Sequence, residues 1–228
     1  MFNDICLYCG VVSPSSFSWN TLFEKNILCE KCRMSLQLLV EPRCKKCCRM
    51  LSNQTIDSIC YDCIRWENDP NWQGVLDHNI SLYHYNEHLK EIIARYKYRG
   101  DYALASIFAS DIKKAAVESG ANIYAPIPLS EARLYERGFN QSEALLTMAK
   151  LPIAKVLTRK HSEKQSKKSR KERLEQSDVF GVQKIDTIQG EKILLIDDIY
   201  TTGSTIRHAA KVLKNAGAKQ IISLTIAR

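Results

Sequence analysis

The feature that most constrains the fold is the segment from Lys192 to Ile206, which reads KILLIDDIYTTGSTI. Its apolar beginning, Lys192 to Ile196, is typical of a short strand buried on both faces of a parallel sheet. Two carboxylates, Asp197 and Asp198, follow where such a strand would emerge, and an amphipathic run begins at Ile206. The segment therefore predicts a strand, a loop and the start of a helix, in that order.

The residues between this strand and this helix are small, hydroxylated or glycine, namely Thr201, Thr202, Gly203, Ser204 and Thr205. Free N–H groups at a helix start, the helix dipole and a glycine that permits close approach favour a bound phosphate. The acid pair is instead expected to accept from ribose hydroxyls or to face Mg2+, which prefers carboxylate and water oxygens. The pattern predicts a sugar phosphate bound with Mg2+; the alternative is a buried strand that ends in an ordinary polar turn.

This stretch closely resembles the phosphoribosyl pyrophosphate (PRPP) motif of type I phosphoribosyltransferases. Both acids, the Thr-Thr-Gly and the closing Ser-Thr are present. The resemblance implies that Asp197 and Asp198 hold the ribose hydroxyls of PRPP and that the loop from Thr201 to Thr205 surrounds its 5-phosphate. Neither G-x-x-x-x-G-K-[ST] nor G-x-G-x-x-G occurs in the chain, so the other common phosphate motifs are excluded.

Cysteine dominates the N-terminal part. Eight of the nine cysteines form C-x-x-C pairs: Cys6 and Cys9, Cys29 and Cys32, Cys44 and Cys47, Cys60 and Cys63. This spacing lets a tight turn present both sulfurs to one tetrahedral ion, and thiolate-only sites suit Zn2+. We predict structural zinc, because a short segment with few apolar runs needs a staple. An iron-sulfur cluster and redox catalysis are the alternatives, and the spacing leaves open one or two zincs with consecutive or interleaved pairing.

Composition sets wider bounds. A chain of 228 residues with 45% hydrophobic and 25% charged residues is long enough for a core of one or two domains. The formal net charge of +8 is compatible with a polyanionic partner but does not require one. The longest apolar runs are only a few residues, and the N-terminus lacks the pattern of a signal peptide. We therefore expect a soluble, cytoplasmic protein without a membrane span.

The order of apolar and polar segments predicts the architecture. A polar stretch at residues 67–79 separates an expected Cys-rich zinc-binding domain, residues 1–66, from a second domain, residues 80–228. Expected strands of the second domain lie at residues 80–85, 123–129, 192–196 and 220–226, and expected helices at 89–98, 101–118, from Asn140 to Lys150 and from Ile206. This alternation predicts an α/β fold with a doubly wound parallel sheet, with the ligand at the carboxyl ends of its strands.

A second phosphate-binding element is expected before the helix that follows Asn140. Arg133 and Arg137 are four residues apart and Gly138 follows them, and guanidinium groups match phosphate oxygens in pairs. Asn140 is a good N-cap, and Gln141 could face the ligand. The alternative is a solvated charged loop.

The whole chain is similar to the ComF family. The residues that carry this resemblance are PIPL and RGFNQ upstream of LLIDDIYTTGST, preceded by the Cys-rich segment. The resemblance implies that Pro128 to Gln141 form the loop on the pyrophosphate side and that Lys97 belongs to the same side. It also implies a role in natural transformation with internalised single-stranded DNA, and the ComFA helicase and DprA as partners.

A strongly basic segment, Arg159 to Arg173, holds eight Lys or Arg residues against two Glu, which is +6 of the net charge of +8. It stands where type I phosphoribosyltransferases carry the loop that closes over PRPP. An active-site lid, a contact with the DNA backbone and a solvated loop are the three interpretations. The candidate DNA contacts are Lys164, Lys167, Lys168, Arg170 and Lys171, and stacking on bases would have to come from elsewhere, for instance from Tyr83, Tyr85, Tyr96 or Tyr98.

Two functions are compatible with these patterns. The first is a competence protein that binds PRPP with Mg2+ and handles single-stranded DNA during natural transformation. The second is an active phosphoribosyltransferase that transfers phosphoribose from PRPP to an acceptor. The chain has no extra segment for recognising an acceptor except the Cys-rich one, which favours the first.

Overall fold

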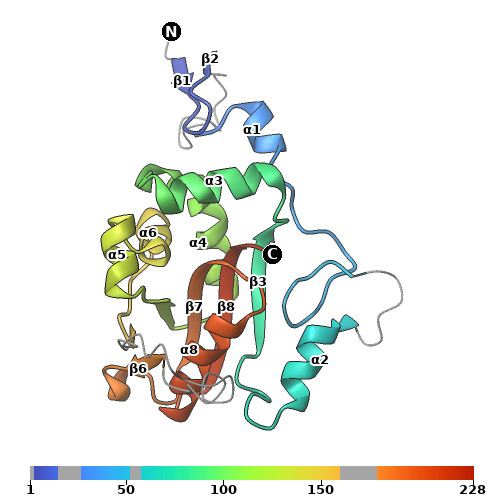
Figure 1. The fold of residues 1–228 in the computed structure, drawn as a ribbon, viewed down its shortest axis with the longest axis vertical. Coiled ribbons are helices and arrows are strands. Elements are labelled where there is room, and N and C mark those ends of the chain that lie inside the picture. Colours follow the sequence, from blue (N-terminus) through green and yellow to red (C-terminus); the bar gives the residue numbers. More distant parts are fainter. Residues whose placement is uncertain (1–2, 15–26, 52–57, 160–178) are drawn as a thin grey trace, which may run out of the picture.

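The computed structural model describes residues 3–14, 27–51, 58–159 and 179–228. Its centre is a four-stranded sheet in the order β3-β8-β7-β4, in which every pairing is parallel (Figure 1). The strands are β3 (His78–Tyr83), β4 (Ile123–Pro126), β7 (Lys192–Ile199) and β8 (Gln220–Ala227). The two central strands are buried over most of their length, as a sheet covered on both faces requires. The predicted parallel α/β fold is confirmed.

Helices cover both faces of this sheet. On one face Leu194 and Ile196 of β7 pack into a core with α3, α4 and α6, and on the other Ile193 and Leu195 pack into a core with α8. Alternate residues of a strand point to opposite faces, so one apolar run serves both cores. The bounds are α3 (Glu87–Tyr98), the 3-10 helix η3 (Tyr102–Phe108), α4 (Ala109–Glu118), α6 (Gln141–Met148) and α8 (Ser204–Asn215).

Three smaller elements complete the α/β part. A short helix, α5 (Glu131–Arg137), precedes α6, and an antiparallel pair joins β5 (Leu157–Arg159) to β6 (Phe180–Val182). A 3-10 turn, η4 (Ile185–Thr187), leads into β7. The sequence did not predict the β5-β6 pair, because each of its strands has only three residues.

Several predicted boundaries need correction. The strand predicted to end at Ile196 continues to Ile199, because its last residues still pair with β8. The helix predicted over residues 101–118 is a 3-10 helix followed by α4. Within the 3-10 helix the Ser106 hydroxyl donates to the carbonyl of Ala103, a local bond that competes with regular helical bonding.

The Cys-rich part contributes β1 (Asn3–Ile5) and β2 (Val12–Pro14), which pair antiparallel, and the helices α1 (Glu30–Met34) and α2 (Tyr61–Asn68). In Figure 1, β1, β2 and α1 lie beyond α3, whereas α2 lies beside the sheet near β3. β3 begins at His78, inside the stretch predicted as a linker. The division into residues 1–66 and 80–228 stays a prediction. Among the described residues, no helix has the length and apolarity needed to cross a bilayer.

Candidate functional site

The acid pair lies at the carboxyl end of β7, as the sequence predicted. Lys97 of α3 forms an ion pair with Asp198, 2.9 Å from Nζ to Oδ2, with side chains only 15% and 10% exposed. Asp197 Oδ1 accepts from the backbone N–H of Asp198 at 2.9 Å and from the Ser142 hydroxyl at 3.4 Å. Three elements, β7, α3 and α6, therefore meet at the two carboxylates.

The electrostatics of this pair favour a further cation or hydrogen-bond donor. Burial, and then the neighbouring charge of Asp198, raise the pKa of Asp197 to about 7, while Lys97 and Ser142 act in the opposite direction. Among the described residues, Lys97 is the cation that forms an ion pair with this acid pair, so two ionised carboxylates exceed the single charge that it supplies. A divalent cation or the hydroxyls of a sugar would offset that charge.

The loop after β7 turns sharply at Gly203. This residue has φ +77° and directly precedes α8. A side chain at this position would collide with the Tyr200 ring and with the Arg207 guanidinium, so glycine is required both by conformation and by space. Glycine at this position therefore allows a sharp turn from the loop directly into the first turn of α8.

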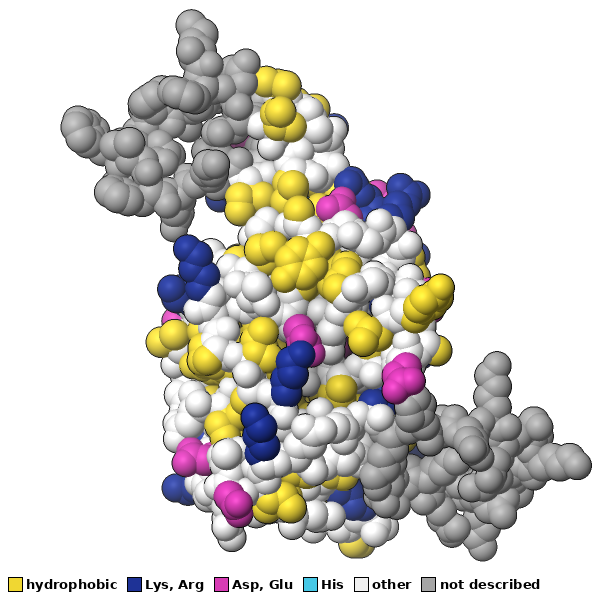
Figure 2. All heavy atoms as spheres, turned by 90° about the vertical axis from the view of Figure 1, so that its left-hand side faces the viewer, with side chains coloured by type: hydrophobic (Ala, Val, Ile, Leu, Met, Phe, Trp, Pro, Cys, Tyr) yellow, Lys and Arg dark blue, Asp and Glu magenta, His cyan; other side chains and the backbone are white. Residues whose placement is uncertain are grey.

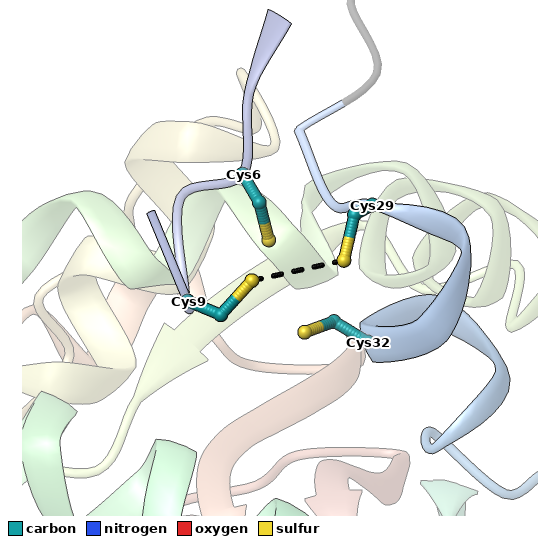
Figure 3. A group of neighbouring side chains, drawn as sticks. All are labelled: Cys6, Cys9, Cys29 and Cys32. Carbon is teal, nitrogen blue, oxygen red and sulfur yellow. Dashed lines mark hydrogen bonds between the residues drawn. The ribbon is translucent and has the colours of Figure 1, made fainter. Parts of the chain in front are cut away.

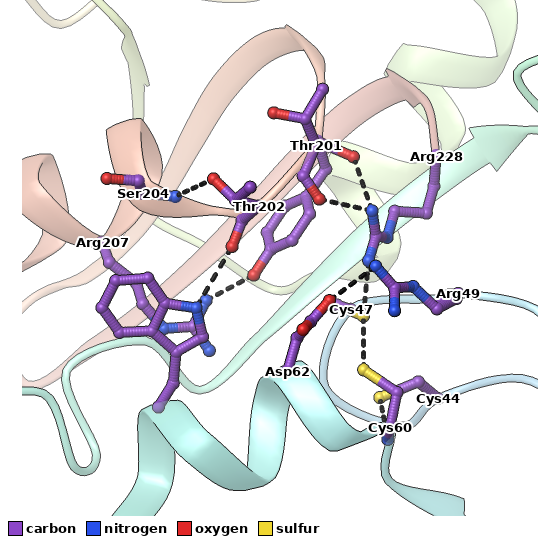
Figure 4. A network of polar contacts seen from close by, with 12 residues as sticks. Cys44, Cys47, Arg49, Cys60, Asp62, Thr201, Thr202, Ser204, Arg207 and Arg228 are labelled. Atoms are coloured by element: carbon purple, nitrogen blue, oxygen red, sulfur yellow. Dashed lines mark hydrogen bonds and ion pairs between the residues drawn. The ribbon is translucent and has the colours of Figure 1, made fainter. Parts of the chain in front are cut away.

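Three consecutive carbonyl groups at this loop, those of Tyr200, Thr201 and Thr202, accept hydrogen bonds from side chains. Arg228 donates from Nη1 to the carbonyls of Tyr200, at 3.1 Å, and of Thr201, and the indole Nε1 of Trp66 donates to the carbonyl of Thr202 at 3.2 Å (Figure 4). These peptides are trans, since the one cis bond found in the described chain is Glu41-Pro42. In a trans peptide the N–H points opposite to the carbonyl.

It follows that the N–H groups of Thr201, Thr202 and Gly203 point away from Arg228 and Trp66. Within the described part of the chain none of them donates to a protein acceptor. They stand at the start of α8, a helix of 12 residues whose dipole adds positive potential. The arrangement suits a phosphate.

Of the residues predicted on the pyrophosphate side, Lys97 lies on α3 and the others lie on α5 or around the start of α6. Gly138, with φ +76°, ends α5, and Asn140 caps α6 by accepting from the N–H groups of its first turn, as predicted. Arg137 donates to the side chain of Gln141 at 2.8 Å and lies over the ring of Tyr98. Gln141 is buried, so it orients Arg137 rather than facing open space.

One further arginine, Arg159 of β5, interacts with the acid pair. Burial and the charge of Arg133 lower the pKa of Arg159, while Asp197 acts to raise it. Arg159 therefore lies within electrostatic reach of both Arg133 and Asp197. The predicted DNA contacts Lys164, Lys167, Lys168, Arg170 and Lys171 lie outside the described residues.

Some residues at this site were not predicted from the sequence. Arg228 follows β8, and β8 pairs with β7 up to Ile199 and Ala227, so the parallel register itself places Arg228 beside the loop. That signal could have been used. Ser142 and Trp66 offered no such signal, because each reaches the site from an element distant in sequence.

The cysteines form two groups of four, and pairing is consecutive. Cys6, Cys9, Cys29 and Cys32 make one group (Figure 3), and Cys44, Cys47, Cys60 and Cys63 make the other. Within each group the sulfur atoms lie within 4.8 Å of one another. Cys9 and Cys29 sulfurs are 3.7 Å apart, and Cys47 and Cys60 sulfurs 3.6 Å. Tetrahedral Zn–S bonds of about 2.3 Å require about 3.8 Å between sulfurs. Each group could therefore bind zinc, and the interleaved alternative is wrong.

The second C-x-x-C of each group opens a helix. Cys29 is the N-cap of α1 and Cys60 the N-cap of α2. Helix starts favour thiolates because their N–H groups and dipole stabilise negative charge. Cys48, which belongs to neither group, donates to the Asn79 carbonyl at 3.0 Å.

The parallel sheet, the acid pair and the loop before α8 define an α/β domain of the phosphoribosyltransferase type. In agreement, the family model described as "Phosphoribosyl transferase domain" matches residues 134–228. Competence protein ComFC of Bacillus subtilis is 36% identical, with 98% of this chain and 95% of that protein covered. ComFC of Streptococcus pneumoniae is 32% identical (98% and 99%), and competence protein F of Haemophilus influenzae 27% (100% and 98%). The chain belongs to the ComF family of competence proteins.

Proposed function

We propose that this chain binds PRPP with Mg2+ at the end of β7. The N–H groups of Thr201, Thr202 and Gly203 receive the 5-phosphate, aided by the hydroxyls of Ser204 and Thr205. The observation that carries the proposal is that these N–H groups have no acceptor among the described residues and stand at a helix start, directly after the acid pair. A phosphate at the loop and a ribose at the carboxylates are thus adjacent, as they are in PRPP.

The acid pair contacts the ribose or Mg2+, and the basic side chains contact the pyrophosphate group. Asp197 and Asp198 accept from the ribose hydroxyls or hold Mg2+, which supplies positive charge to the pyrophosphate group. Lys97, which is paired with Asp198 in the free chain, lies where it can turn to pyrophosphate once the carboxylates have another partner. Arg133 and Arg137 bind the same group from α5.

A titration tests this proposal directly. PRPP with Mg2+ is titrated calorimetrically into the wild type, into the Asp197→Asn, Asp198→Asn double variant, and into Asp186→Asn as an exposed control. We expect the double variant to lose at least about tenfold in affinity, because each acid loses a charge-assisted contact. A zinc-loaded, folded wild type that gives no heat at several temperatures would contradict the proposal.

The alternative function is transfer of phosphoribose to an acceptor. The same residues would then act in catalysis: the arginines and Mg2+ would stabilise the departing pyrophosphate, and the acid pair would hold the ribose as positive charge develops on it. Release of pyrophosphate on addition of a base or nucleotide would favour this function. The absence of release with a wide panel would favour binding alone.

We further propose that the chain handles single-stranded DNA in competence, with the ComFA helicase and DprA as expected partners. The basic segment leaves the described fold at Arg159, close to Asp197 and Arg133. On the face that carries α5 and α6, Lys and Arg side chains of the described residues are interspersed with acidic ones rather than gathered (Figure 2). On this face, the charge for backbone contacts would therefore have to come chiefly from residues 160–173.

The DNA proposal has its own test. Replacing Lys167, Lys168, Arg170 and Lys171 with Ala should weaken binding of a single-stranded oligonucleotide and flatten its dependence on salt by roughly 0.7 per lost phosphate contact. Fluorescence anisotropy over a series of salt concentrations measures both quantities. An unchanged affinity and slope would remove this segment from the DNA site.

A further inference from the structure

The guanidinium of Arg228 connects the loop to the second cysteine group. Its Nη1 donates to the carbonyls of Tyr200 and Thr201, and its Nη2 lies 3.5 Å from the sulfur of Cys47. The group also stacks on the ring of Tyr200, 5.1 Å from its centroid. Because a guanidinium is planar and rigid, these contacts fix the loop relative to the sulfur atoms (Figure 4).

Helix α2 makes a second connection. It begins after Cys60 and contains Cys63, so the cysteine group sets the position of its first turn. Near its other end, Trp66 donates to the Thr202 carbonyl at 3.2 Å. The same indole lies 5.0 Å from the guanidinium of Arg207, which is 1% exposed and fixed on α8.

The hydrogen bonds from Arg228 and Trp66 affect phosphate binding because they fix the orientation of the loop peptides. Three consecutive loop carbonyls, from Tyr200 to Thr202, are held on the side away from the ligand. Without their donors these peptides could rotate, and a rotated peptide would turn a carbonyl oxygen toward the phosphate and withdraw an N–H from it. A phosphate repels carbonyl oxygens, so its affinity depends on this restraint.

We infer that the second cysteine group positions the loop for its anion, with Trp66 and Arg228 as positioning residues. The inference rests on the proposed phosphate site and assigns the Cys-rich part a role beyond folding. It also predicts reciprocal linkage. A change that destabilises this cysteine group should lower the affinity of the loop for its ligand, and bound ligand should stabilise the cysteine group.

Matched variants test the affinity. Trp66→Phe removes the indole donor, and Arg228→Met removes the guanidinium but keeps an unbranched side chain. Their controls are Trp72→Phe and Arg49→Met. Trp72 contacts Trp66, but within the described residues its indole donates to no atom of the loop. Arg49→Met removes an ion pair to Asp62 beside the same cysteine group. We expect the first two to bind PRPP with Mg2+ at least about fivefold more weakly than their controls, with full zinc content and similar melting temperatures.

A readout without ligand separates this inference from the proposed function. With 5-fluorotryptophan incorporated, the chain gives one fluorine resonance for each of its three tryptophans, and the Trp66→Phe variant assigns that of Trp66. Arg228→Met should shift or broaden the Trp66 resonance, because Trp66 and Arg228 hold adjacent peptides, and Arg49→Met should not.

The outcomes are distinct. A wild type that binds no PRPP, but whose Trp66 resonance responds to Arg228→Met, overturns the proposed ligand and supports the restraint. A wild type that binds PRPP only as tightly as Trp66→Phe and Arg228→Met do overturns the inference and leaves the proposed function in place. An unchanged Trp66 resonance in Arg228→Met also overturns the inference, with or without PRPP.

Discussion

Replacing Cys47 with serine is expected to unfold the α/β part of the chain, whereas replacing Cys9 with serine should leave it folded. The second cysteine group is buried, with Cys47 fully so, and it packs in one core with Leu76, Ile193 and Ile221. A lost metal would leave several buried thiols and a gap at the edge of the sheet. Structural zinc supplies on the order of 10 kcal/mol in small domains, which is comparable with the whole stability of a typical domain.

The first cysteine group is built differently, which makes it the matched control. Cys9 is exposed, and the small core around this group contains Cys6, Leu28 and Cys32. Its loss should unravel β1, β2 and α1 locally and lower the main melting temperature by only a few degrees, on the order of 1 kcal/mol for a chain of this size.

Thermal unfolding followed by circular dichroism, with zinc counted by mass spectrometry, measures both effects. The wild type should hold two zinc ions per chain and the Cys9→Ser variant one, with the main transition retained. The Cys47→Ser variant should be recovered largely unfolded. If Cys47→Ser melts near the wild-type temperature, or if the wild type holds no zinc, the structural role assigned to this group is wrong.

The sheet and the acid pair could be predicted because their signals are local. An apolar run such as Lys192 to Ile196 identifies a buried strand through its composition alone, and the carboxylates at its end occupy fixed positions relative to it. The capping role of Asn140 was predictable for the same reason, since an N-cap is defined by residues that follow within one turn. The paired spacing of cysteines likewise indicated metal-binding turns.

What the sequence could not supply is the set of contacts between distant segments. The bond from Trp66 to Thr202 joins residues 136 positions apart, and nothing in either neighbourhood specifies it. Consecutive pairing of the cysteines follows from the short distances between the sulfur atoms within each group, which the spacing along the chain does not determine. Gln141 shows the same limit, because its place beside Asn140 suggested that it could face the ligand, whereas nothing in the sequence indicated that it accepts a hydrogen bond from Arg137.

Replacing Asp197 with asparagine is expected to stabilise the ligand-free chain at pH 8 and to lower its affinity for PRPP. Burial and then Asp198 raise the pKa of Asp197 from its ordinary 3.8 to about 7. Between these values the folded state holds a proton that the unfolded state has released, so this group makes stability fall as pH rises from about 4 to 7. Asparagine has no proton to lose and avoids that cost.

The expected gain at pH 8 is on the order of 1–3 kcal/mol, reduced from the full shift because Asp197 is partly accessible to solvent. At pH 5, where the wild-type carboxyl is mostly protonated, the gain should be small. Urea unfolding of wild type and variant at both pH values measures it, and Asp186→Asn serves as the exposed control. An equal gain at both pH values, or none at pH 8, would contradict the assignment.

The same unfolding measurement helps to explain why a destabilising carboxylate occupies position 197. If Asp197→Asn stabilises the free chain and lowers its affinity for PRPP, then the carboxylate at this position lowers the stability of the fold. That is typical of residues that serve binding. Asp198→Asn should behave in the opposite way in the free chain, because its carboxylate forms the ion pair with Lys97 at 2.9 Å and its loss leaves a buried ammonium without that partner. Opposite effects of two adjacent acids on stability, with a shared loss of PRPP affinity, would distinguish a ligand site from a structural ion pair.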